Sequence, residues 1–91
     1  MEINWTSHAL GDLARLYEFL APVNPKAAAD VFEKLVAGPD VLMYQPRIGT
    51  PLTEFSPRDV RFLLVGDYEV RYEITQKEIW ILRLWHTRED R

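Results

Sequence analysis

The sequence predicts an α+β domain with the element order β-α-α-β-β-β, in which a two-helix hairpin covers one face of an antiparallel sheet. Two stretches in the first half of the chain repeat apolar residues at three- and four-residue intervals, which is the period of a helix. The second half carries three short runs rich in β-branched and aromatic residues, as strands do. With 91 residues, the chain is expected to form a single domain, residues 1–91.

The first predicted strand is short, because only Ile3 and Trp5 alternate with polar neighbours before the pattern changes. Thr6 or Ser7 can cap the helix that follows, since a hydroxyl accepts a hydrogen bond from an unpaired amide of the first turn. One apolar stripe then runs along this helix: Leu10, Leu13, Leu16, Tyr17 and Leu20.

The second helix is predicted to begin at Asn24-Pro25, because proline at the first helical position loses only an amide that has no partner there. Its apolar stripe consists of Ala27, Ala28, Val31, Phe32 and Leu35. Pro39 cannot donate to the carbonyl of Leu35, so the helix must kink or restart at that point. A proline-punctuated loop, "QPRIGTPLTEFSPRD", leads to the strands.

Gly66-Asp67 separates "VRFLLV" from "YEVRYEI" and predicts a two-residue hairpin loop. Val65 would then pair with Tyr68, and opposed residues share a face of the sheet. The helix-covered face would carry Leu63, Val65, Tyr68, Val70, Tyr72, Trp80, Leu82 and Leu84. The second face would carry Phe62, Leu64, Glu69, Arg71, Glu73, Ile81, Arg83 and Trp85. A one-residue bulge would exchange these sets within one strand.

The second face is more apolar than a sheet surface in contact with water. A loop or the C-terminal tail can fold over it, or it can be a partner surface, since an apolar patch rimmed by charges marks interaction sites. Arg71 and Arg83 share this face, where they either clamp an acidic residue of a partner or pair with Glu69 and Glu73.

Composition argues against several classes of function. The net charge of −3 disfavours general nucleic-acid binding, which is driven by phosphate contacts. Without cysteine, and with only His8 and His86 far apart, we expect neither a disulfide scaffold nor a metal site, and no cofactor is indicated. The N-terminus lacks the pattern of a signal peptide and no apolar run is long enough to span a membrane, so a soluble, cytoplasmic protein is expected.

Several stretches in order carry a resemblance to a known family: "INWTSHALGDLARLYEFL", the Asn-Pro start of the second helix, "QPRIGTPL", "RDVRFLLVGDYEVRYEI" and "IWILRLWHTREDR". Over essentially its whole length the chain resembles the RelE/ParE superfamily of bacterial toxins, whose fold has the element order predicted above. The run "VGDYEVRYEI" followed by "ILRLWHTRED" is most similar to the ParE branch. The resemblance implies a small cognate antitoxin whose C-terminal segment wraps the toxin and lies along its sheet.

RelE-type members cleave messenger RNA on the ribosome, using basic residues on the second strand and an arginine just after the tyrosine that opens the next strand. Those positions correspond here to Val60, Phe62 and Glu69, which supply no cation for a phosphate. The net charge and Glu69 therefore favour the ParE type, whose members inhibit DNA gyrase by binding it.

Two residues near the end of the chain keep a ribonuclease interpretation open. Arg88 matches the late arginine of RelE-type enzymes, and His86 matches the histidine of the related YoeB-like branch. Where that branch has a tyrosine, however, this chain has Thr87, and His86 can equally be a strand-end histidine that bonds the backbone or Glu89.

The sequence thus leads to one preferred hypothesis, a ParE-like toxin that inhibits gyrase and growth and is neutralised by an antitoxin. The alternatives are a RelE-type ribonuclease, with His86 and Arg88 as its catalytic residues, or an inactive toxin-like binding module. The residues expected to bind the antitoxin are Phe62, Leu64, Arg71, Ile81, Arg83 and Trp85. Those expected to contact the target are His86, Arg88 and Arg91.

Overall fold

The computed structural model describes residues 1–89 and confirms the predicted fold class and element order. The five strands are β1 (Glu2–Trp5), β2 (Thr50–Pro51), β3 (Asp59–Val65), β4 (Tyr68–Ile74) and β5 (Glu78–His86). The α-helices are α1 (Ser7–Leu20) and α2 (Pro25–Ala37), and two 3₁₀ segments are η1 (Gly38–Met43) and η2 (Thr53–Phe55). The short strand β2 and η2, both within the proline-punctuated loop, were not predicted.

Both helices begin where the sequence predicted. The Thr6 hydroxyl accepts a hydrogen bond from the Ala9 amide at 3.1 Å, and the Asn24 side chain accepts one from the Ala27 amide at 3.1 Å. Helix α2 ends at Ala37, and the chain continues as η1 with Pro39 buried at its start. Of the two predicted outcomes, a kink or a restart, the structure shows the α-helix ending and a new 3₁₀ segment beginning at this proline.

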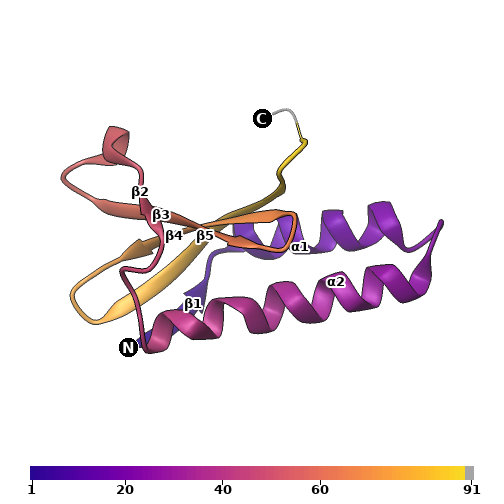
Figure 1. Ribbon diagram of the computed structural model, residues 1–91, viewed down its shortest axis with the longest axis horizontal. Coiled ribbons are helices and arrows are strands. Elements are labelled where there is room, and N and C mark those ends of the chain that lie inside the picture. The colour runs from indigo at the N-terminus through magenta and orange to yellow at the C-terminus, as the bar shows by residue number, and fades with distance from the viewer. Residues whose placement is uncertain (90–91) are drawn as a thin grey trace.

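The strand order is β1-β5-β4-β3-β2, and β1 runs parallel to β5 while the other pairs are antiparallel. The sheet was predicted to be antiparallel throughout, and the parallel pair β1–β5 is the exception. Because the two helices lie between β1 and the later strands, the chain has enough length to return and place its last strand beside its first in the same direction. In Figure 1, α1 and α2 form a hairpin that extends beyond the sheet at one end.

The β3–β4 hairpin has the predicted register, with Val65 opposite Tyr68. Gly66 has a φ of 58°, and it is the first of the two loop residues, the position where a type II′ turn requires glycine. The assignment of β3 and β4 residues to two faces follows from this register.

The register of β5 was predicted incorrectly beyond a bulge. Arg71 pairs with Arg83, but Tyr72 pairs with Ile81, so one extra residue, Leu82, stands in β5. The bulge exchanges the faces in the first part of the strand. Ile81 is fully buried in the core and cannot belong to a partner surface, whereas Trp80 lies opposite Glu73 on the second face.

A single hydrophobic core lies between the helices and the sheet. It consists of Ala9, Leu13, Leu16, Leu35, Leu42, Val70, Tyr72, Ile74, Ile79, Ile81 and Leu84. Of the aromatic residues predicted for it, Tyr72 is fully buried, Tyr68 packs against its border, and Trp80 is absent from it; Trp5 of β1 also packs against the border. Neither of the helices in residues 1–89 combines the length and apolarity that crossing a bilayer requires.

Tyr72 also fastens the proline-punctuated loop to the sheet. Its hydroxyl donates to the Pro46 carbonyl at 2.7 Å and accepts from the Gly49 amide at 2.9 Å. A Cβ on Gly49 would lie 2.5 Å from that hydroxyl, so only glycine permits this close approach. Burial raises the pKa of Tyr72, although the Gly49 amide opposes the shift, and the phenol stays neutral.

Candidate functional site

The sheet face opposite the helices, here called the outer face, carries a stack of alternating rings and guanidinium groups. The Cζ atom of Arg71 on β4 lies 5.2 Å from the centroid of the Phe55 ring and 4.6 Å from the centroid of the Trp85 ring. Arg83, the register partner of Arg71, lies 5.2 Å from the same Trp85 ring. Such cation–π contacts hold the guanidinium planes against the rings. The structure thus confirms that Arg71 and Arg83 share a face.

The loop between β2 and β3 covers one end of the outer face. Val60 is 1% exposed, Phe55 lies over Arg71, and Arg58 forms a bidentate ion pair with Glu73 at 2.7 and 3.1 Å. Of the two explanations for the apolar second face, a covering loop therefore accounts for this end.

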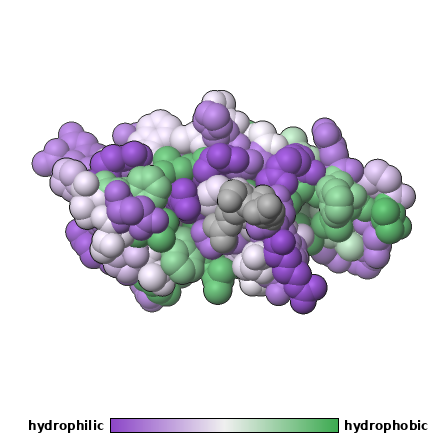
Figure 2. Space-filling view, turned by 90° about the horizontal axis from the view of Figure 1, so that it is seen from above, coloured by the Kyte–Doolittle hydropathy of each residue, from purple (hydrophilic) through white to green (hydrophobic). Residues whose placement is uncertain are grey.

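Away from that loop the described residues leave the outer face partly exposed, although Glu69 and Trp85 are only 8% and 7% exposed. Leu64 is 57% exposed, and Phe62 and Trp80 are half-buried. Viewed from above, apolar and hydrophilic side chains are interspersed over the molecule, and hydrophobic atoms also gather at the end where the α1–α2 turn lies (Figure 2). In that turn Val23 is 86% exposed.

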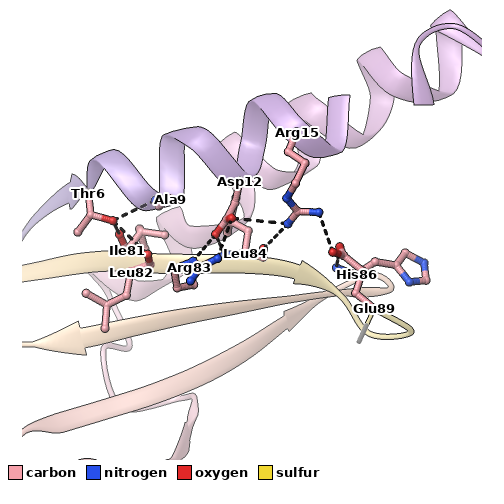
Figure 3. A network of polar contacts seen from close by, with 10 residues as sticks. All are labelled: Thr6, Ala9, Asp12, Arg15, Ile81, Leu82, Arg83, Leu84, His86 and Glu89. Carbon is pink, nitrogen blue, oxygen red and sulfur yellow. Dashed lines mark hydrogen bonds and ion pairs between the residues drawn. The ribbon is translucent and has the colours of Figure 1, made fainter. Parts of the chain in front are cut away.

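Arg83 reaches round the edge of β5 to an acid on α1. β1 pairs with β5 only as far as Ile81, so beyond this residue β5 is an edge strand. Asp12, 5% exposed, accepts hydrogen bonds from Arg83 Nε at 2.7 Å, from Arg83 Nη2 at 3.1 Å and from the Leu84 amide at 2.9 Å (Figure 3). The carboxylate thereby satisfies the Leu84 amide, which would otherwise be free to pair with another strand at this edge.

The electrostatics of Asp12 follow from these contacts. Burial by itself would raise the pKa of Asp12, but the hydrogen bonds from Arg83 and the Leu84 amide, with the charges of Arg83 and Arg15, lower it overall. The bond to Asp12 correspondingly raises the pKa of Arg83. Asp12 and Arg83 are therefore both ionised near neutral pH. The hydrogen bonds of Arg83 to Asp12 stabilise the contact between β5 and α1.

Two further side chains extend this arrangement, here called the β5-edge network, in both directions along α1 (Figure 3). The Thr6 hydroxyl lies within hydrogen-bond distance of the Ile81 and Leu82 carbonyls, at 3.0 and 3.1 Å. Arg15 pairs with Glu89 at 2.6 Å, and Glu89 also accepts from the His86 amide at 2.8 Å. The segment after β5 is thus fastened to α1.

Next to the Arg15–Glu89 ion pair lies a cavity of about 510 Å³, between α1, the start of β4 and the end of β5. We call it the end cavity; its lining residues are Arg15, Leu16, Phe19, Leu20, Tyr68, His86, Arg88 and Glu89. Its wall is mainly apolar, with cationic and acidic groups at one side. Two of the three predicted target-contact residues, His86 and Arg88, meet here, and Arg91 lies outside the described residues.

His86 is held in a structural arrangement at this cavity. Its Nδ1 accepts a hydrogen bond from the Arg88 amide at 3.1 Å, and its ring meets the Tyr68 ring edge-on at a centroid distance of 5.0 Å. Burial, with the nearby charges of Asp67 and Glu89, raises the pKa of Tyr68, so this phenol is not activated as a base. The backbone contact is the one predicted for a strand-end histidine.

The predicted site residues fall into two separate groups. Phe62, Leu64, Arg71, Arg83 and Trp85 lie on the outer face. His86, paired with Tyr68, faces the helix side, because side chains alternate along a strand. The sequence therefore indicated both surfaces, but it did not indicate that the sheet separates them.

Sequence reasoning missed two residues that shape these surfaces. Phe55 lies in a loop without periodicity, so nothing signalled that it would stack on Arg71. Asp12 did carry a signal, since it follows Ala9 by three residues and precedes Leu16 by four, which places it on the buried side of α1. A polar residue at such a position needs a partner.

The described part of the chain, residues 1–89, contains no cluster of three or more histidine or carboxylate side chains placed to hold a metal ion. The arrangements present are an arginine–aromatic stack and an apolar cavity with charged sides. Both are suited to contact with another molecule.

Comparison with known proteins places the chain in a family. A family model described as ParE toxin of type II toxin-antitoxin system, parDE, matches residues 3–91. A solved structure, the chromosomal ParDE toxin–antitoxin system from P. aeruginosa, is similar with a TM-score of 0.79 and 25% identity, covering 94% of this chain and 95% of that chain. No curated protein matches. The chain therefore belongs to the ParE toxin family of type II toxin–antitoxin systems.

Proposed function

We propose that this protein inhibits DNA gyrase by binding it, and that a cognate antitoxin neutralises it by covering its outer face. The family match over residues 3–91 carries the proposal, and the ParDE system with a similar structure supports the pairing with an antitoxin. The open part of the outer face, with Leu64 57% exposed beside Phe62, supports a second protein chain as its occupant.

Binding is favoured over RNA cleavage by what stands at the positions where RelE-type enzymes have basic residues. Val60 is 1% exposed, and Phe62 is apolar, so neither offers a cation or a proton. Glu69, which is 8% exposed, is an acid where RelE-type enzymes have an arginine, so it supplies no cation for a phosphate. His86 faces the other side of the sheet.

The proposed surface for the target is the end cavity with His86 and Arg88, together with Arg91 in the terminal segment. The end cavity lies on the opposite side of the sheet from the surface proposed for the antitoxin. Neutralisation would then act by blocking the approach of the target or by changing the end cavity, and need not involve the same residues.

The proposal is tested by inducing the protein alone in bacteria and by adding the purified protein to a gyrase supercoiling assay. We expect growth to stop, cells to filament with a DNA-damage response, and supercoiling to be inhibited. Co-expression of the short reading frame next to its gene should restore growth. Rapid loss of messenger RNA in a translating extract, with gyrase unaffected, would contradict the gyrase proposal in favour of a ribonuclease. Normal growth at high expression would instead indicate an inactive binding module.

A further inference from the structure

Arg71 differs from the other arginines of the described chain because its Nε is buried without a hydrogen-bond partner among those residues. Other half-buried or networked arginines are paired: Arg15 with Glu89, Arg58 with Glu73, Arg61 with Asp59 and Arg83 with Asp12. An unpaired buried N–H of a charged group is destabilising.

Two aromatic rings contact the guanidinium group of Arg71. The rings of Phe55 and Trp85 lie on it at 5.2 and 4.6 Å and keep water from it on those sides. Packing against two rings restricts the rotamers of the Arg71 side chain, so less side-chain entropy is lost when an anion binds there. Reduced contact with water also strengthens a charge-assisted hydrogen bond.

The neighbours of Arg71 indicate which anion fits. Phe62 is its register partner on β3, and the exposed Leu64 lies two residues further along the same strand, on the same face. Glu69 and Glu73 precede and follow Arg71 by two residues on the same face, so β4 carries no run of cations that could follow the phosphates of a nucleic-acid strand. A single carboxylate flanked by apolar side chains meets both the charge of Arg71 and the apolar surface beside it.

We propose that Arg71 is the receptor for one acidic side chain of the antitoxin, an Asp or Glu with apolar neighbours that contact Phe62 and Leu64. This inference rests on the proposed function for the identity of the partner chain. The chemistry of the site, a carboxylate received by an aromatic-stacked arginine, is independent of whether gyrase is the target.

The first test measures the affinity of the co-encoded antitoxin for the wild-type protein and for Arg71→Gln, Arg71→Lys and Arg58→Gln. We expect Arg71→Gln to weaken binding by about 10- to 100-fold, as the loss of one charge-assisted contact does. Arg71→Lys should recover little, because an ammonium lacks the planar fork. Arg58→Gln is the matched control, since Arg58 is exposed and already paired, and its affinity should be unchanged.

A double-mutant cycle then identifies the acid. Each Asp and Glu of the antitoxin is changed to Asn or Gln, and one of these changes should weaken binding to the wild-type protein but not to Arg71→Gln. Equal affinity of Arg71→Gln and wild type, or the absence of any acidic residue coupled to Arg71, would overturn the inference.

A second test needs no antitoxin, so it separates failure of this inference from failure of the proposed function. The Nε–H resonances of arginine are followed by NMR while the blocked peptides acetyl-Leu-Glu-Leu-amide and acetyl-Leu-Gln-Leu-amide are added. The Arg71 signal should shift with the Glu peptide only, and the Arg58 signal should not move. No shift with the Glu peptide would refute a carboxylate site even if gyrase is inhibited. A larger response to a single-stranded oligonucleotide would assign the site to phosphate and likewise overturn the proposal.

Discussion

Arg71 and Arg83 are opposite each other on neighbouring strands and lie against the same tryptophan ring, yet their surroundings differ. Arg83 stands on the edge strand and reaches round it to Asp12, which it holds with two hydrogen bonds. Arg71 stands on the central strand β4, where no acid of the helix layer is within reach, and its Nε is unpaired among the described residues.

The difference shows how one strand pair can serve both stability and binding. Position in the sheet decides the role, because only an edge residue can contact both layers of this small domain. The β5-edge network satisfies its own charges and thereby stabilises the fold. The Nε of Arg71 has no partner among the described residues, and we have proposed that a carboxylate of the antitoxin binds this side chain, as is expected where function and stability compete.

The largest effect should come from removing the acid of the β5-edge network. Asp12→Ala leaves the Leu84 amide and Arg83 without their acceptor, and we expect it to lower the free energy of unfolding by about 2–3 kcal/mol. Urea denaturation measures the change. The control is Asp30→Ala, whose only described ion pair is with exposed Lys26, and which should change stability by less than about 0.5 kcal/mol. Similar values for both variants would show that the network contributes little.

The two arginines should respond oppositely to the same substitution. Arg83→Met leaves Asp12 buried with fewer partners and should destabilise by about 1–2 kcal/mol. Arg71→Met removes a charged group whose Nε is unpaired among the described residues and retains contact with the two rings, so stability should stay within about 0.5 kcal/mol of wild type or increase. The thermal unfolding midpoints of both variants are measured under the same conditions. A lower midpoint for Arg71→Met than for Arg83→Met would contradict the prediction.

A smaller effect is expected in the dependence of stability on pH. Because the pKa of Asp12 is lowered in the folded state, its contribution is complete above its unfolded value of about 3.9 and is lost as the pH falls through the folded value. Urea midpoints measured from pH 6 downward should therefore converge for the wild type and Asp12→Asn in acid. A constant difference at every pH would mean that ionisation of Asp12 is unimportant.

The smallest effect should follow from removing the ion pair between Arg15 and Glu89 after the end of β5. Glu89→Gln removes the charge that pairs with Arg15, and since this pair is partly exposed we expect a loss of about 0.2–1 kcal/mol. The amide oxygen can still accept from the His86 amide, so the segment should stay in place. Chemical shifts of the His86 and Tyr68 rings report on the end cavity, and large changes in them would indicate that the ion pair holds it.

Much of the fold follows from local signals in the sequence. The caps at Thr6 and Asn24, the interruption of the helix at Pro39 and the hairpin at Gly66 depend on the conformational limits of a few adjacent residues, and each was predicted correctly. The faces of β3 and β4 followed from the hairpin. By contrast, the face of Ile81 was predicted wrongly, because a bulge adds one residue without any composition signal in an all-apolar run.

The candidate surfaces were predictable only as lists of residues. Period-two alternation and the resemblance of the chain to its family together indicated the outer-face residues and the charged end of β5. Tertiary structure alone decided that Arg83 belongs to the fold, that Phe55 closes over Arg71, and that His86 faces away from both. These outcomes depend on contacts between residues far apart in the chain, such as Asp12 with Arg83, whose partners are selected by packing and by the need to satisfy buried charge.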